Sequence, residues 1–307
     1  MLDIKSQKNR AQAFTTSITP FDKNGTLDEA ALRKHLRRFA DAGIGAFMGT
    51  GGSGEGYSLS ASETRRLLEI SVEELKGKVP VRAMGVEPRS AAEMIEFVKM
   101  AQATGIEAIQ IYSLDVGHGH APTPEELEAY FNEVLNASDA PMVLSTHQSV
   151  GYKLPIEMMA RLVETYEHVI GINCSHQDLE YLRGLIDAVG ERVDVMVGGP
   201  MQAVICFAFG GHGFLCSEGN LAPRLAVSLI KYYQASDLDG MMEAFGKIAR
   251  LSGALYGNGG IRVTKAVLNE LGLPGGYPRK PRLLVTDERL TRAMSVVREL
   301  NLEELRT

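Results

Sequence analysis

The chain has 307 residues, of which 45% are hydrophobic and 23% charged, and its formal net charge is −6. This size and composition are typical of a globular protein with one large α/β domain or two smaller ones. The sequence has no basic run interleaved with aromatic residues and no apolar stretch long enough to cross a bilayer. These absences argue against a nucleic-acid partner and against a membrane partner.

The cysteines and the first residues favour a cytoplasmic protein. Cys174, Cys206 and Cys216 are an odd number without paired spacing, which indicates reduced thiols and not a disulfide framework. The first residues are polar and include no apolar core of a signal peptide, so we expect no secretion signal.

Short apolar runs, each followed by a polar loop, recur along the chain and are typical of buried parallel strands. In chain order, the predicted strands are Ala13–Ile18, Ile44–Met48, Val79–Met84, Ala108–Tyr112, Met142–Ser145, Val169–Ile172, Val193–Val197 and Gly213–Cys216.

Amphipathic segments lie between these runs, and three of them begin with capping signals. Asp is a favoured N-cap, and Ser or Thr followed three residues later by Glu can form a capping box. These signals predict helices Glu29–Ala42 after Asp28, Glu63–Leu75 after Ser60 and Glu125–Asn136 after Thr123, with Gly43 ending the first.

Strands that alternate with helices imply a parallel sheet with right-handed crossovers, and eight such units favour closure into a (β/α)₈ TIM barrel. We expect residues 1–220 to form the barrel core. Residues 221–307 should form its last helix and a C-terminal helical extension, packed as one unit with the barrel. The helices predicted there are Leu221–Gln234, Leu238–Tyr256, Ile261–Leu271 and Thr286–Leu300.

The loops that follow the strands hold the candidate site residues, because chemistry in such barrels takes place at the C-terminal strand ends. The loop Gly49–Tyr57 contains a G-x-G-x-x-G pattern. The next helix begins only after Ser60, so we interpret the loop as an anion-binding turn with the Ser53 hydroxyl as a donor, not as a dinucleotide site. A loop of tight turns without a ligand is the alternative.

This loop and other stretches resemble the dihydrodipicolinate synthase / N-acetylneuraminate lyase family. The family has a Gly-Thr-Thr-Gly-Glu motif whose threonines hold the substrate carboxylate, and this chain reads Gly52-Ser53-Gly54-Glu55. Further matching stretches are Thr19-Pro20-Phe21, Gly171-Ile172, Asp178-Leu179, Asn220-Leu221-Ala222-Pro223 and Lys265-Ala266-Val267-Leu268. The resemblance covers nearly the whole chain and implies a TIM barrel, a small 2-oxo acid substrate and a homo-oligomer, a tetramer or a dimer.

Three positions depart from the family pattern. The family's sixth strand ends in a lysine that forms a Schiff base, but this chain has Asn173, whose amide nitrogen is not nucleophilic. Ser145 replaces a proton-relaying tyrosine after the fifth strand, and Gly198 begins a Gly-Gly-Pro run in place of Gly-Asp. We therefore expect catalysis without an iminium. The alternative is that Lys153 supplies the amine.

Histidines are enriched in the strand-end loops. His147 lies in the loop of the missing tyrosine and is a candidate general acid/base. A divalent metal held by His118, His120, His147 or His176, with Glu55, is an alternative way to stabilise an enolate. Solvated loop histidines are the simpler explanation, so we expect no metal and no cofactor.

Two further candidates have structural alternatives. Arg89 could bind a second carboxylate of the substrate, or it could pair with Glu87 in an exposed loop. Cys174 could be a nucleophile, although a small buried thiol is the more common role.

The sequence favours a lyase of the aldolase or dehydratase type that acts on a small 2-oxo acid or sugar-acid carboxylate. Asn173, His147 and Ser145 are the catalytic candidates, and Gly52, Ser53, Gly54, Glu55, Arg89 and Gly198 are the substrate-binding candidates. The alternative is a catalytically silent relative that binds a metabolite or an active paralogue.

Overall fold

A computed structural model describes residues 4–257 and 259–305 of the chain. Eight parallel strands form a closed barrel in chain order, as the alternating pattern predicts. The strands are β1 Gln12–Thr16, β2 Gly45–Met48, β3 Val81–Ala83, β4 Ala108–Ile111, β5 Met142–Thr146, β6 Val169–Cys174, β7 Asp194–Val197 and β8 Gly213–Cys216.

Helices follow the strands and continue beyond the last one. They are α1 Ile4–Arg10, α2 Glu29–Ala42, α3 Ala61–Leu75, α4 Ala91–Gln102, α5 Pro124–Asn136, α6 Ile156–Thr165, α7 Leu179–Val189, α8 Ala203–Ala208, α9 Pro223–Ala235, α10 Leu238–Tyr256, α11 Ile261–Glu270 and α12 Glu288–Leu300. The C-terminal helical extension is therefore present, while the division of the chain at residue 220 stays a prediction.

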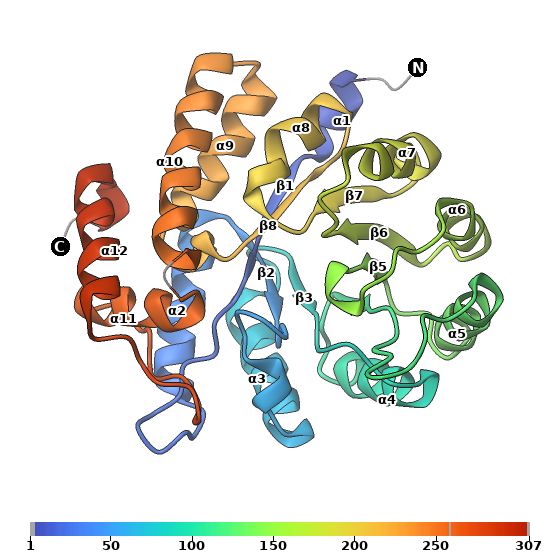
Figure 1. The fold of residues 1–307 in the computed structure, drawn as a ribbon, viewed down its shortest axis with the longest axis horizontal. Helices are drawn as coiled ribbons and strands as arrows, with labels where there is room; N and C mark the ends of the chain where they lie inside the picture. Colours follow the sequence, from blue (N-terminus) through green and yellow to red (C-terminus); the bar gives the residue numbers. More distant parts are fainter. Residues whose placement is uncertain (1–3, 258, 306–307) are drawn as a thin grey trace. The chain divides into compact units, whose positions relative to one another are not determined.

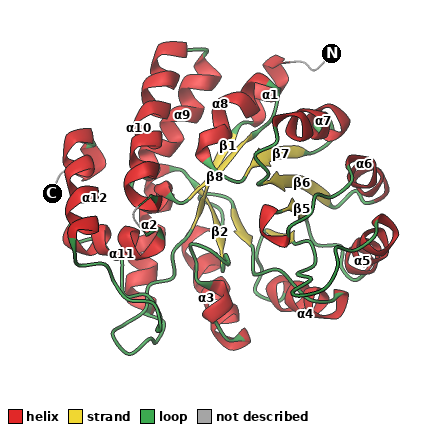
Figure 2. Ribbon diagram, viewed as in Figure 1, coloured by secondary structure: helices red, strands yellow, loops and turns green. Residues whose placement is uncertain are grey.

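The residues group into two compact units. The first contains the residues up to Ala11 together with Arg82–Leu215, and the second contains Gln12–Val81 together with the residues from Cys216 onward. In the first unit, α4, α5, α6 and α7 form an outer arc around the strands (Figure 1), and the colouring by secondary structure shows the same two layers (Figure 2). The strand side chains that face these helices, such as Leu144, Ile172 and Val195, are fully buried.

In the second unit, α2 packs against α3, and the C-terminal helices pack against one another. Helix α10 contacts both α9 and α12 and lies between them (Figure 1). Each has a buried face, which includes Leu229 on α9, Leu251 on α10 and Ala293 on α12. This explains why these segments are amphipathic in the sequence.

The predicted capping residues act as expected. Asp28 accepts a hydrogen bond from the Ala31 N–H, and Gly43 ends α2 in the left-handed conformation. Ser60 and Thr123 form the predicted capping boxes at α3 and α5. Among the described residues, no helix is both long and apolar enough to cross a membrane.

Candidate active site

Two of the predicted catalytic residues lie side by side in the first unit. Strands β5 and β6 pair in parallel with Ser145 opposite Asn173. Residues paired in this way point to the same face of a sheet. Both are buried, with 1% of Ser145 and 5% of Asn173 exposed.

The Asn173 side chain points into the barrel. Its Nδ2 donates to Oε1 of Gln110 at 2.5 Å, and Gln110 lies on β4, with β5 between the two strands. Side chains from alternate strands meet in this way on the interior face of a barrel. The Oδ1 of Asn173 is buried without a hydrogen-bond partner among the described residues. Leaving such an acceptor unpaired is unfavourable, so the Oδ1 of Asn173 is open to a hydrogen bond from water or from a ligand.

His147 follows β5 and lies against a carboxylate. Its Nδ1 is 3.2 Å from Oε1 of Glu87, and the Ser149 hydroxyl donates to the same oxygen at 2.7 Å. The hydrogen bond with His147 is the main cause that lowers the pKa of Glu87 to about 2. Ser149 also contacts this Nδ1, through its hydroxyl and through its backbone N–H at 3.3 Å. Together these contacts orient the imidazole and leave Nε2 for proton transfer.

Tyr112 connects His147 with the interior amides. The two rings are packed edge to face, with centroids 6.0 Å apart. Burial and the charge of Glu87 raise the pKa of the Tyr112 hydroxyl, although a hydrogen bond with Gln110 opposes this. The hydroxyl therefore stays protonated. Glu87, His147, Tyr112, Gln110 and Asn173 thus form a continuous row of polar groups within the first unit.

The other histidines do not assemble a metal site in the part of the chain that is described. His118 and His120 are exposed. His176 is buried, and its Nε2 has no hydrogen-bond partner in the described part of the chain. Its ring lies edge to face on Tyr181. No group of three His, Cys, Asp or Glu among residues 4–257 and 259–305 could hold a metal ion.

The surroundings of Cys174 and of Lys153 favour structural roles for both residues. Burial raises the pKa of the Cys174 thiol to about 11, so its thiolate is scarce near neutral pH. The Lys153 ammonium contacts the Asp178 carboxylate and lies 5.5 Å from the centroid of the Tyr181 ring. Asp178 also caps α7. Lys153 is therefore held by the residue that caps α7.

Two predicted binding residues of the first unit have well-defined positions. A Cβ on Gly198 would lie 2.6 Å from Cβ of Ser175, so only glycine fits there without a shift. Arg89 is exposed, and its backbone N–H donates to Oε2 of Glu93 at 2.7 Å. Glu87, its alternative partner in the sequence, is engaged by His147.

Ser53 belongs to a cluster of hydroxyl groups in the second unit. Its Oγ lies 3.2 Å from Thr16 Oγ1, 2.5 Å from Ser217 Oγ and 3.3 Å from the Tyr256 hydroxyl. Thr16 and Ser217 are themselves 2.9 Å apart. Neighbouring hydroxyls can rotate their protons toward a common acceptor, which suits an anionic group.

A buried acid follows this cluster in the chain. Glu218 is only 2% exposed, and its Oε2 has no hydrogen-bond partner among the described residues. Burial raises its pKa, and a hydrogen bond from Ser252 opposes the shift. A buried carboxyl group with a raised pKa thus lies near the Ser53 hydroxyl cluster.

The glycine-rich loop is a folded turn. Thr50 Oγ1 accepts from the Gly54 N–H at 2.8 Å, and Thr19 Oγ1 donates to the Gly54 carbonyl at 2.7 Å. A Cβ on Gly54 would lie 2.8 Å from the Thr50 backbone, whereas one on Gly52 would meet no atom within 4 Å. Gly54 is therefore required by packing, and Gly52 borders open space.

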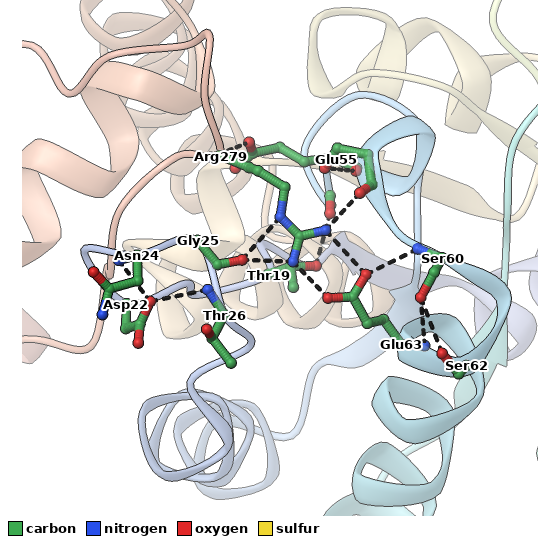
Figure 3. A network of polar contacts seen from close by, with 12 residues as sticks. Thr19, Asp22, Asn24, Gly25, Thr26, Glu55, Ser60, Ser62, Glu63 and Arg279 are labelled. Atoms are coloured by element: carbon green, nitrogen blue, oxygen red, sulfur yellow. Dashed lines mark hydrogen bonds and ion pairs between the residues drawn. The ribbon is translucent and has the colours of Figure 1, made fainter.

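Glu55 is engaged inside the second unit. Its carboxylate contacts the Lys265 ammonium, and both side chains are completely buried. The Arg279 N–H donates to Glu55 Oε2 at 3.0 Å. The Arg279 guanidinium also holds Glu63 through both carboxylate oxygens, and these residues converge in Figure 3. Glu55 thus anchors the loop that carries Ser53.

Sequence reasoning did not identify Gln110, Tyr256 or Glu218. Gln110 lies within an apolar strand and was not selected as a candidate. A single polar residue in such a strand can indicate a hydrogen bond inside the barrel. Tyr256 lies at the end of a helix, 203 residues from Ser53 along the chain. No local signal connects two such positions.

The sequence matches the dihydrodipicolinate synthetase family over residues 9–300. The chain belongs to this family. The 4-hydroxy-tetrahydrodipicolinate synthase of Methanopyrus kandleri is 30% identical over 266 residues, which cover 86% of this chain and 87% of the relative. The lyase-type family inferred from the motifs is therefore confirmed.

Solved structures of the family share the fold. A crystal structure of dihydrodipicolinate synthase (dapA) has a TM-score of 0.86 at 24% identity and covers 95% of this chain and 99% of its own. The N-acetylneuraminate lyase of Mycoplasma synoviae has a TM-score of 0.82 at 22% identity and covers 95% and 98%. At these identities the likeness establishes the TIM barrel with its C-terminal helices.

Proposed function

We propose that the protein is a lyase of the aldolase or dehydratase type that acts on a small 2-oxo acid or sugar-acid carboxylate without a Schiff base. The observation that carries the proposal is the inward-facing Asn173. Its Nδ2 is held by Gln110, and its Oδ1 is buried and has no partner within residues 4–257 and 259–305. A carboxamide in this state can accept a hydrogen bond from a substrate hydroxyl, but it cannot form an iminium.

Proton transfer is assigned to His147. Glu87 and Ser149 contact its Nδ1, and these contacts support a role for Nε2 as the group that exchanges a proton with the substrate. In an aldol cleavage, loss of a hydroxyl proton breaks the adjacent carbon–carbon bond and sends the electron pair to the carbonyl oxygen. Tyr112, whose hydroxyl remains protonated, is suited to stabilise that oxygen as a neutral donor. Ser145, in register with Asn173, would add a further hydroxyl.

We assign the binding of the substrate carboxylate to Ser53. This assignment rests on the family motif, in which hydroxyl side chains hold that group, and on the three hydroxyls gathered around Ser53 in the second unit. Gly52 leaves open space beside Ser53, and Gly54 and Glu55 fix the turn. Arg89 and Gly198 remain candidates for contacts with the rest of the substrate.

A metabolite-binding relative without turnover, or one that binds an active paralogue, is the second candidate. The hydroxyl cluster around Ser53 is sufficient for recognition of a carboxylate and does not itself require chemistry. Turnover across a panel of 2-oxo acids and sugar acids would distinguish a lyase from a binding protein.

Borohydride trapping with pyruvate tests the absence of a Schiff base. We expect the unmodified chain to gain no reduced adduct by mass spectrometry, and the variant Asn173→Lys provides an amine at the same position as a matched control. An adduct on Lys153 in the unmodified chain would overturn the non-covalent route.

Homo-oligomerisation, as a tetramer or a dimer, and a cytoplasmic location remain predictions. Light scattering coupled to size exclusion measures the first directly.

A further inference from the structure

A cavity of about 230 Å³ lies within the second unit, apart from the Ser53 hydroxyl cluster. It is bordered by the turn Lys23–Gly25 and by the segment Tyr277–Leu284. A water molecule occupies about 30 Å³ of liquid, so the cavity has room for an anion of several heavy atoms. Its lining contains four basic residues and no acidic one: Lys23, Arg279, Lys280 and Arg282.

Three of these four cations have no carboxylate partner in the described part of the chain. Arg279 is neutralised by Glu63, whereas no ion pair joins Lys23, Lys280 or Arg282 to an acidic side chain of residues 4–257 and 259–305. Other arginines of the same unit, such as Arg66 and Arg250, are paired with glutamates. Lys23, Lys280 and Arg282 are all exposed, so their charges are accessible to a ligand from solvent.

Aromatic rings position two of the cations without neutralising them. The Arg282 guanidinium lies 4.4 Å from the centroid of the Tyr57 ring, and the Lys23 ammonium lies 5.9 Å from that of Tyr277. Such contacts orient a cation and leave its full charge available for a ligand. The acidic residue of the same turn, Asp22, accepts instead from the backbone N–H groups of Asn24 and Thr26 (Figure 3).

We propose that this cavity binds a compact, multiply charged oxyanion, namely a phosphate group that is free or carried on a small metabolite. Arg282 would bind it through two N–H groups, and Lys23 and Lys280 would contribute point charges. Nothing in this proposal depends on the reaction that the barrel performs.

The cavity is connected to the glycine-rich loop within the same unit. Arg279 donates to the Gly25 carbonyl on one side of the cavity and to the Ser58 carbonyl and Glu63 beyond the loop. Its backbone N–H binds Glu55 inside the loop. Figure 3 shows Gly25 and Glu63 around the Arg279 guanidinium. Tyr57, whose ring contacts the Arg282 guanidinium, is the last residue of the glycine-rich loop. An anion that binds Arg282 would therefore act on the loop that contains Ser53.

A tryptophan at position 57 makes this binding visible. The chain has no tryptophan, so Tyr57→Trp introduces a single fluorophore and keeps a ring for Arg282. We expect a saturable fluorescence change on titration with inorganic phosphate and with glycerol 3-phosphate, weaker at high salt, and none with acetate at equal ionic strength. Stronger binding of the ester than of free phosphate would identify a phosphorylated metabolite as the source, and the reverse would identify phosphate itself.

Calorimetric titration of the unmodified chain tests the same site without the reporter. Each of Arg282→Gln and Lys280→Gln should weaken phosphate binding about tenfold. Arg292→Gln, which removes an exposed arginine of the same unit, should leave the affinity unchanged. Absence of saturable binding to the unmodified chain, or equal affinity in the Arg282→Gln and Lys280→Gln variants, would overturn the proposal.

Discussion

At the scale of single residues, the carboxamide of Asn173 determines which chemistry the barrel interior can support. Its Nδ2 is fixed by Gln110, so its Oδ1 is directed as an acceptor at a defined place. An amine at this position would attack a carbonyl, whereas an amide oxygen can only orient a hydroxyl or N–H group. In the proposed function, acid–base catalysis comes from another residue, and His147 is the candidate for this role.

His147→Gln should lower kcat/KM by about 10²- to 10⁴-fold, because it removes the general base while keeping a polar side chain. Glu87→Gln should reduce kcat by roughly tenfold with little change in KM, because the amide orients the imidazole less well and does not stabilise its charged form. Steady-state kinetics on the best substrate from the panel measures both effects.

Glu96→Gln is the matched control for the loss of a carboxylate, since Glu96 is exposed on α4 of the same unit. Full activity in His147→Gln would remove His147 from the mechanism.

The residues found from sequence were those whose place in a motif is fixed, such as Asn173 at the end of an apolar run. Gln110 was not found because its partner is 63 residues away. Strand periodicity tells which residues share a face, but not which face turns inward when a strand is buried on both sides. The missing information is the three-dimensional register.

At the scale of elements, local signals predicted boundaries where side chains bind the backbone. Helix α2 begins after Asp28 and ends before Gly43, as expected. The ninth helix begins at Pro223 and not at Leu221, because residues 218–220 form a short 3₁₀ turn first. Strand β6 continues through Asn173 to Cys174, since both pair with β7. A polar residue ends an apolar run in the sequence without ending a strand.

Lys265 on α11 forms a completely buried ion pair with Glu55, which suggests a test. Lys265→Met should reduce the free energy of unfolding by about 3–5 kcal/mol, because it leaves the Glu55 carboxylate buried without its cation. Adding Glu55→Gln should recover part of this loss by removing the uncompensated charge. Urea denaturation followed by circular dichroism measures both variants.

Lys247→Met on α10 is the matched control. Lys247 pairs with Glu243 at the surface, so its replacement should change the free energy of unfolding by less than about 0.5 kcal/mol. Equal urea midpoints for Lys265→Met and the parent chain would show that the buried pair does not stabilise the loop.

At the scale of the whole molecule, the barrel could be predicted because its pattern is repeated. Eight apolar runs, each followed by a helix, allow few other arrangements, and an error of two residues in one boundary leaves the topology unchanged. The chemistry has no such redundancy. A single side chain at position 173 separates an iminium mechanism from any other, so the family fixes the fold more firmly than the reaction.

Two buried histidines, one in each unit, predict how the stability of the whole molecule depends on pH. His35 Nε2 donates a hydrogen bond to Asn220 Oδ1 at 3.0 Å, and His35 Nδ1 faces the Arg38 guanidinium. His212 Nδ1 accepts the Val195 N–H at 3.0 Å, and its Nε2 contacts Gln7. Both rings are therefore neutral, and burial lowers their pKa values to about 3 for His35 and about 4 for His212.

Because the unfolded chain takes up these protons below about pH 6.5 and the folded chain does not, the free energy of unfolding should fall as the pH decreases from 6.5 toward 4. At pH 5 the loss is about 2 kcal/mol for each histidine. Glu218, whose pKa is raised, acts in the opposite direction, so the test compares variants. His35→Gln keeps a donor for Asn220 and should reduce the loss between pH 7 and 5 by about 2 kcal/mol, while the exposed His120→Gln should not. An equal loss in His35→Gln and the parent chain would mean that His35 is already charged when folded, against the geometry around Arg38.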